Sequence, residues 1–248
     1  MGGNRFKIFL RRCEALREPT LTNQHPVLHW AHQLYEKSEV RGLEDLSKII
    51  LRPLQSRHIA DAYFKPPHQA IEELWWLDSL GFSGWLPGAD RDLNSSIIRS
   101  VVPAPAGHLL NLSTDIILPT SWHPSSIVNL LGRIGSERPL GRFKQSSNHQ
   151  VTFMIPLGIG WVSGGNHSIA QGIIRGEGEI APTEYLDVTE IVRRVTFDGK
   201  SWRCCSTGHR LGRPRYIELG LVWEISRLIV TLKAASSDND AGDNDCGR

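Results

Sequence analysis

The residues whose types and spacing best fit chemistry lie in one short block of the sequence, GGNHS. Gly164 and Gly165 let the backbone turn sharply and approach another group closely. Asn166, His167 and Ser168 then supply an amide, an imidazole and a hydroxyl where an apolar-periodic segment begins. The first N–H groups of a helix have no intrahelical partner and favour an anion. The block therefore predicts a binding site for a phosphate or a carboxylate.

Within this block, His167 is the candidate catalytic residue. An imidazole titrates near neutral pH and can act as a general acid or base. His167 also shares a helix face with Gln171, four positions later. In the alternative interpretation the two glycines only form a tight corner, Asn166 or Ser163 only caps the helix, and His167 only binds a carbonyl group. The sequence leaves open whether a reaction occurs, and it identifies no cofactor and no metal ligand set.

The elements that must position the block are short strands and helices. The patterns predict strands at residues 149–155 and 158–162, followed by a helix at 166–175. Its buried side is expected to hold Ile169, Ala170, Ile173 and Ile174. Upstream, residues 115–118 predict a buried strand. A helix then begins at Ser121 or His123, with Pro124 in its first turn, and runs to Ile134.

This order of elements resembles the ParB/sulfiredoxin-like fold over residues 115–187. The matching positions are Ile116-Ile117-Leu118-Pro119, then Pro124, Ile127, Leu130 and Ile134, then Gly164 to Ala170, then Gly176 to Ile180. The resemblance implies that nucleotide phosphates bind at the GGNHS turn, and some members of that group are nucleases or nucleotide hydrolases. Ser168 stands where the family has an arginine, so this chain offers one hydroxyl in place of a planar, charged fork.

A second resemblance covers more of the chain. The run from Gly158 to Ala170, together with the late amphipathic segment from Tyr216 to Leu232, is similar to a bacterial family of unknown function with a G-I-x-W-V-x-G-G-N-H-S-I-A block. This resemblance implies no activity.

The whole chain predicts an α+β fold in three parts. Residues 1–107 predict a helical region, with helices at 25–37, 44–54 and 70–80, a loop at 81–96 and a proline-rich linker at 101–107. Residues 108–233 predict the ParB/sulfiredoxin-like core, which closes with an extended segment at 180–188, a helix at 187–195, a hairpin at 196–205 and the helix at 216–232. Residues 234–248 are acidic and of low complexity, and we expect them to be disordered.

Other clusters have more ordinary interpretations. Three histidines, His25, His29 and His32, have helical spacing but favour a solvated face. Cys204 and Cys205 with His209 lack a fourth zinc ligand. Two further sets could contact nucleic acid, but the first favours core packing and the second a solvated loop: Trp75, Trp76 and Trp85; and Arg203, Arg210, Arg213 and Arg215.

Bulk properties set the limits of the functional prediction. The net charge of +2 is too small to predict nucleic-acid binding by itself. Four cysteines without a CxxC pair, no apolar run of roughly 20 residues and no secretory leader favour a soluble, cytoplasmic protein. The leading prediction is a nucleotide- or phosphate-binding module with a degenerate ParB-like site, nucleotide or DNA as its partner and no membrane contact. The alternative is a structural, protein-interaction protein in which GGNHS is a corner.

Overall fold

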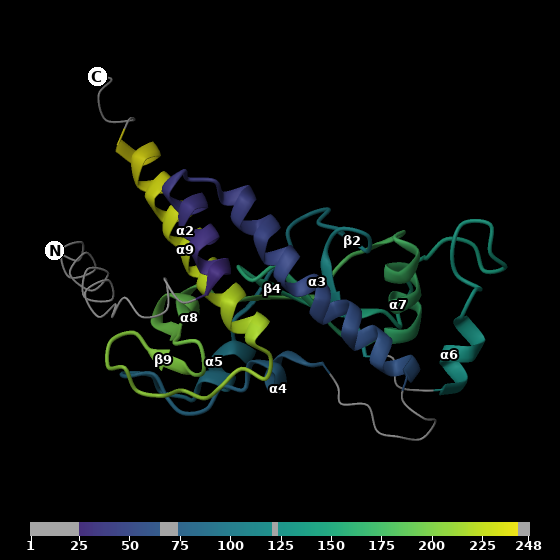
Figure 1. The fold of residues 1–248 in the computed structure, drawn as a ribbon, viewed down its shortest axis with the longest axis horizontal. Helices are drawn as coiled ribbons and strands as arrows, with labels where there is room; N and C mark the ends of the chain where they lie inside the picture. The colour runs from purple at the N-terminus through teal and green to yellow at the C-terminus, as the bar shows by residue number, and fades with distance from the viewer. Residues whose placement is uncertain (1–24, 65–73, 121–123, 243–248) are drawn as a thin grey trace.

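The computed structural model describes residues 25–64, 74–120 and 124–242, and their fold is α+β, as the sequence predicts (Figure 1). The helices are α2 (Pro26–Glu36), α3 (Val40–Phe64), α4 (Trp76–Leu80), α5 (Leu93–Ile98), α6 (Pro124–Leu130), α7 (Asn166–Arg175), α8 (Thr189–Arg194) and α9 (Ile217–Gly242). The strands are β1 (Val101–Val102), β2 (Leu110–Asn111), β3 (Ile116–Leu118), β4 (Gln150–Ile155), β5 (Ile159–Gly164), β6 (Glu179–Ile180), β7 (Glu184–Asp187), β8 (Val195–Phe197) and β9 (Trp202–Cys204).

The central sheet has five strands in the order β1-β7-β4-β5-β3. β3 runs parallel to β5, with Ile116 opposite Ile159, and β4 runs parallel to β7. β4 and β5 are antiparallel, so the two parallel pairs point in opposite directions. The carboxyl ends of β3 and β5 therefore lie at one edge of the sheet, and those of β4 and β7 lie at the other. Two short ladders, β2-β6 and β8-β9, complete the strand pairing.

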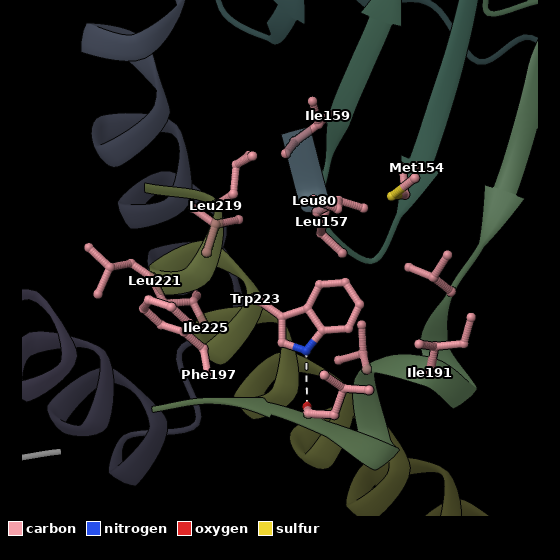
Figure 2. Close-up of a cluster of buried hydrophobic side chains, with 14 of the residues drawn as sticks. Leu80, Met154, Leu157, Ile159, Ile191, Phe197, Leu219, Leu221, Trp223 and Ile225 are labelled. Atoms are coloured by element: carbon pink, nitrogen blue, oxygen red, sulfur yellow. Dashed lines mark hydrogen bonds between the residues drawn. The ribbon is translucent and has the colours of Figure 1, made fainter. Parts of the chain in front are cut away.

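A layer formed by α2, α3 and α9 packs beside this sheet (Figure 1). α3 contacts both α9 and β3, so the long N-terminal helix spans from the C-terminal helix to the sheet. Trp223 of α9 lies in the core among Leu157, Ile191 and Phe197, and its indole N–H donates to the carbonyl of Val195 at 3.0 Å (Figure 2). That bond satisfies the polar atom of a fully buried ring.

Several predicted elements are confirmed. The helix at 166–175 has the predicted bounds, because a left-handed glycine stands at each end. The strands near 115–118, 149–155 and 158–162 are present, and so is the hairpin around Asp198-Gly199. The structure also has helices within 25–37 and 187–195. Of the helix expected at 70–80, residues 70–73 lie outside the described residues, and α4 begins at Trp76. Ser121 and His123 also lie outside the described residues.

Other predictions differ from the structure. The helix expected at 44–54 extends over Val40–Phe64, with Pro53 in its interior. The expected loop at 81–96 contains the start of α5, because Asp92 caps that helix by accepting the N–H of Ser95. The expected linker begins with β1, which pairs with β7. The helix expected to reach Ile134 ends at Leu130.

The C-terminal segment also differs from its prediction. α9 continues to Gly242 and so includes residues 234–242, which composition predicts to be disordered. Extending a formed helix adds one hydrogen bond for each residue that is ordered, and Ala234 and Ala235 favour this extension.

Candidate functional site

The GGNHS turn joins the end of β5 directly to α7. Gly165 is the N-cap, with φ 74° in the left-handed region that glycine favours. A Cβ atom at Gly165 would lie 2.4 Å from Cδ2 of His149, and one at Gly164 would lie 2.6 Å from the carbonyl oxygen of Asn148. Both glycines are therefore required by the close approach of the chain that precedes β4.

Two of the predicted binding side chains make bonds within the fold. The carboxamide oxygen of Asn166 accepts the backbone N–H of Thr120 at 2.7 Å, which ties α7 to the end of β3. The hydroxyl of Ser168 donates to the carbonyl of Gly165 at 3.0 Å and lies 2.7 Å from Nε2 of His149. These bonds give both side chains a role in holding the corner.

His149 completes this network, although no local pattern in the sequence predicts its contact with the turn. Its Nδ1 accepts the N–H of Ser146 at 2.8 Å, so the proton of the neutral ring is on Nε2. Nε2–H then donates to the hydroxyl of Ser168. Burial lowers the pKa of His149 below its ordinary value, because it disfavours the charged ring. Local spacing gives no signal for the contact, because His149 precedes Ser168 by a whole hairpin.

His167 lies half-buried in the first turn of α7. Gln171, predicted to share its face, is buried and donates to the hydroxyl of Tyr63 at 2.9 Å. At the same sheet edge, Nε2 of His58 lies 3.1 Å from the hydroxyl of Thr120. Side chains of α3 therefore meet the edge where β3 and β5 end.

The buried side of α7 is confirmed only in part. Ile169 and Ala170 are fully buried, but Ile174 is 52% exposed. Gln171 takes a buried position because its amide finds a partner on α3.

A cleft of about 830 Å³ lies at the opposite edge of the sheet, between α3, α9 and the turn from β4 to β5. Its floor is apolar and draws on several elements, including Leu51 of α3, Ile116 of β3, Leu157 of the turn and Ile229 of α9. Each of these four side chains is at most 2% exposed. The cleft therefore opens onto the molecule's main hydrophobic core.

The rim of the cleft is charged. Lys48 of α3 pairs with Asp115 at 2.9 Å, and Lys233 of α9 pairs with Glu44 at 3.3 Å. Further rim side chains are Arg41, Asp45 and Arg193. Sequence reasoning missed this cleft because its residues come from segments far apart in the chain, and no spacing within one segment signals it.

The histidine and cysteine candidates have local partners. Nδ1 of His25 accepts the N–H of Val27 at 3.4 Å and so caps α2, and His29 lies 3.2 Å from the amide of Gln33. The thiol of Cys204 lies 3.2 Å from the hydroxyl of Ser206. Within residues 25–64, 74–120 and 124–242, no group of three or more His, Cys, Asp or Glu side chains could hold a metal ion.

The tryptophan and arginine clusters separate into buried and surface residues. Trp76 is buried, while Trp85 is 55% exposed. Arg203 pairs with Asp198 at 2.6 Å, and the guanidinium of Arg215 lies over the ring of Tyr216. In the part of the chain that is described, no helix has the length and apolar character to cross a membrane.

Comparison with known proteins identifies a family without a known activity. Neither a curated protein nor a solved structure matches the chain, and no finding supports the resemblance to the ParB/sulfiredoxin-like fold. A family model does match residues 19–236, and the chain therefore belongs to the family of unknown function DUF6710.

Proposed function

We propose that this protein binds a small organic molecule in the cleft between α3, α9 and the sheet. The observation that carries the proposal is the combination of an apolar floor and a charged rim in one cavity of about 830 Å³. Small-molecule sites usually have volumes of roughly 300–1,000 Å³ and combine apolar walls with a few polar groups. The cleft also adjoins the carboxyl ends of the parallel strands β4 and β7, where ligands of α/β sheets commonly bind.

A fluorescent probe tests this proposal. We expect 1-anilinonaphthalene-8-sulfonate to bind the folded protein saturably, with one site per chain. Ala234→Trp should abolish this binding, because Ala234 is an exposed residue of α9 that lines the cleft. Ala235→Trp is the matched control, since Ala235 is the next exposed position of the same helix and is not among the lining residues. Equal probe binding by both variants would place the probe elsewhere and contradict the proposal.

A second candidate function is phosphate or nucleotide binding at the GGNHS turn. DNA is included, because its backbone presents the same phosphate groups. The observation that favours it is the glycine N-cap of α7, which has no side chain that could accept the first N–H groups of the helix. This N-terminus lies at the edge of the sheet where β3 and β5 end. Asn166 and Ser168 already bond within the fold, so recognition would fall on the backbone N–H groups that follow Gly164 and Gly165 and on the imidazole of His167. If chemistry occurs there, His167 is its candidate acid or base.

A thermal-shift screen tests this second candidate. ATP, with and without Mg²⁺, and short DNA should each be compared with buffer. A ligand at about 100 times its dissociation constant stabilises by about 2.7 kcal/mol, which raises Tm by roughly 2–4 °C for a chain of this size. His167→Ala should remove the shift, whereas His209→Ala, in an exposed loop, should keep it. If no nucleotide or DNA raises Tm, the turn is a structural corner, which is the alternative interpretation.

A further inference from the structure

We propose that the ligand of the cleft is an organic anion with a hydrocarbon body, such as a straight-chain aliphatic carboxylate. This inference rests on the proposed function, because it names the class of molecule that the same cleft would hold. It follows from two features, the chemistry of the floor and the balance of charge on the rim.

The floor favours a hydrocarbon body. Phe153, Ile155 and Pro156 line the cleft and are half-buried, so they retain accessible hydrocarbon surface. The core continues beneath them with Leu51 and Ile229. A polar group placed against them would lose its hydrogen bonds to water without replacement. Each methylene placed there is instead removed from water, and burial of such groups is favourable.

The rim carries more positive than negative side chains. Four cations line the cleft, Arg41, Lys48, Arg193 and Lys233, against three acids, Glu44, Asp45 and Asp115, which leaves one positive charge in excess. Asp115 and Glu44 are held in ion pairs with Lys48 and Lys233. Asp115 also accepts the N–H of Asn111 at 2.7 Å, so both of its oxygens are engaged. These two acids are therefore poorly placed to bind a cationic ligand.

The two arginines suit a carboxylate. Arg193 pairs with Glu190, whose side chain is 74% exposed and does not line the cleft. An ion pair so exposed to water is weak and can be exchanged for a ligand anion. Arg41 is an exposed residue of α3 on the same rim. A guanidinium presents a planar fork of donors that matches the two oxygens of a carboxylate.

A head-group series on one hydrocarbon chain tests this inference. Decanoate, decanol and decylammonium would be titrated below their micellar concentrations by isothermal calorimetry. We expect decanoate to bind at least about tenfold more tightly than decanol, because this is the difference in affinity that one hydrogen bond to a charged group produces. Decylammonium should bind more weakly than both. The double variant Arg41→Gln/Arg193→Gln should lower the affinity for decanoate to that for decanol and leave decanol unchanged.

The control is Arg133→Gln/Arg138→Gln, which removes two exposed arginines outside the cleft and should preserve the preference for decanoate. Equal binding of decanoate and decanol, both blocked by Ala234→Trp, would overturn the anionic class and leave the proposed function standing. A preference for decanoate that survives in Arg41→Gln/Arg193→Gln would overturn the role of these two arginines. Failure of all three ligands and of the fluorescent probe would overturn the proposed function itself.

Discussion

Gly165 and His149 pack against each other at the start of α7, and the bonds around them hold the GGNHS corner. The imidazole of His149 links Ser146 to Ser168, and the hydroxyl of Ser168 returns to the carbonyl of Gly165. A network of this kind contributes most when every member is satisfied, and it loses most when one member is displaced. At the scale of single residues, the stability of the turn therefore depends on the small volume of Gly165 and on the protonation state of His149.

Gly165→Ala should lower the free energy of unfolding by about 3 kcal/mol. The left-handed φ costs an L residue about 1–2 kcal/mol, and the new Cβ would also displace the ring of His149. Gly141→Ala is the matched control, because Gly141 has φ 70° and open space around its Cβ position. It should cost only about 1 kcal/mol. Urea unfolding of both variants measures the difference, and equal losses would show that the contact with His149 is unimportant.

Stability should fall as the pH drops through the titration range of histidine. His149 has an ordinary pKa of 6.5 that burial lowers in the fold, so below this value the unfolded chain binds a proton that the folded chain resists. The contribution of neutral His149 is thus fully present above the ordinary pKa and is lost as the pH falls below it. His149→Gln keeps a donor toward Ser168 but does not titrate. Chemical denaturation from about pH 7.5 to about pH 5.5 should show a shallower pH dependence for this variant; parallel curves would refute the assignment.

At the scale of elements, α9 is joined to the hairpin β8–β9 by the partly buried carboxylate of Glu224. Oε1 of Glu224 accepts the N–H of Phe197 at 2.7 Å and the hydroxyl of Thr196 at 3.0 Å, and Oε2 pairs with Arg227 at 2.9 Å. Strand β8 thus obtains a hydrogen-bond partner from a helix side chain. This arrangement fixes how the C-terminal helix lies against the hairpin.

Glu224→Ala should destabilise the fold by about 2 kcal/mol, because it removes the acceptor of the N–H of Phe197 and the ion pair with Arg227. Glu218→Ala on the same helix removes a pair with Arg57, whose side chain is 53% exposed, and should cost less than about 1 kcal/mol. Thermal and urea unfolding of the two variants make the comparison. A loss at Glu218 equal to that at Glu224 would contradict the importance of the bonds that Glu224 makes to β8.

At the scale of the whole molecule, the helical region before residue 107 shares one core with the segment after it. The same hydrophobic cluster includes Leu28 and Leu51 from α2 and α3 together with Trp161 of β5 and Trp223 of α9. In addition, Gln55 of α3 donates to the carbonyl of Ile117 in β3 at 2.7 Å. The division at residue 107 stays a prediction about organisation along the chain, but the packing couples its two sides.

We therefore expect both sides to unfold in a single transition. Far-UV circular dichroism, dominated by the helices, and tryptophan fluorescence should give coincident urea curves. A fragment of residues 108–248 should lack a cooperative transition, because it exposes the surface that α2 and α3 cover. Two separate transitions, or a fragment that unfolds cooperatively, would show that the parts are independent.

Some features of this protein follow from the sequence alone. The helix at 166–175 and the buried strand near 116–118 were predictable, because glycine punctuation and apolar spacing act over a few neighbouring residues. The composition of residues 234–242 does not predict that the helix continues through them, because composition describes a segment in isolation. In the fold, these residues extend a helix that has already formed over the preceding part of α9.

Only the tertiary structure decided how the candidate residues are used. Asn166 is predicted to hold a ligand, and in the fold its carboxamide oxygen accepts the N–H of Thr120, which is distant in sequence. Ile174 is predicted to be buried but is exposed. Gln171 is buried instead, because Tyr63 of α3 satisfies its amide. The cleft, too, exists only where α3, α8, α9 and the sheet come together. Local patterns determine which segments form helices and strands, whereas hydrogen-bond partners and cavities depend on long-range packing that no local spacing encodes.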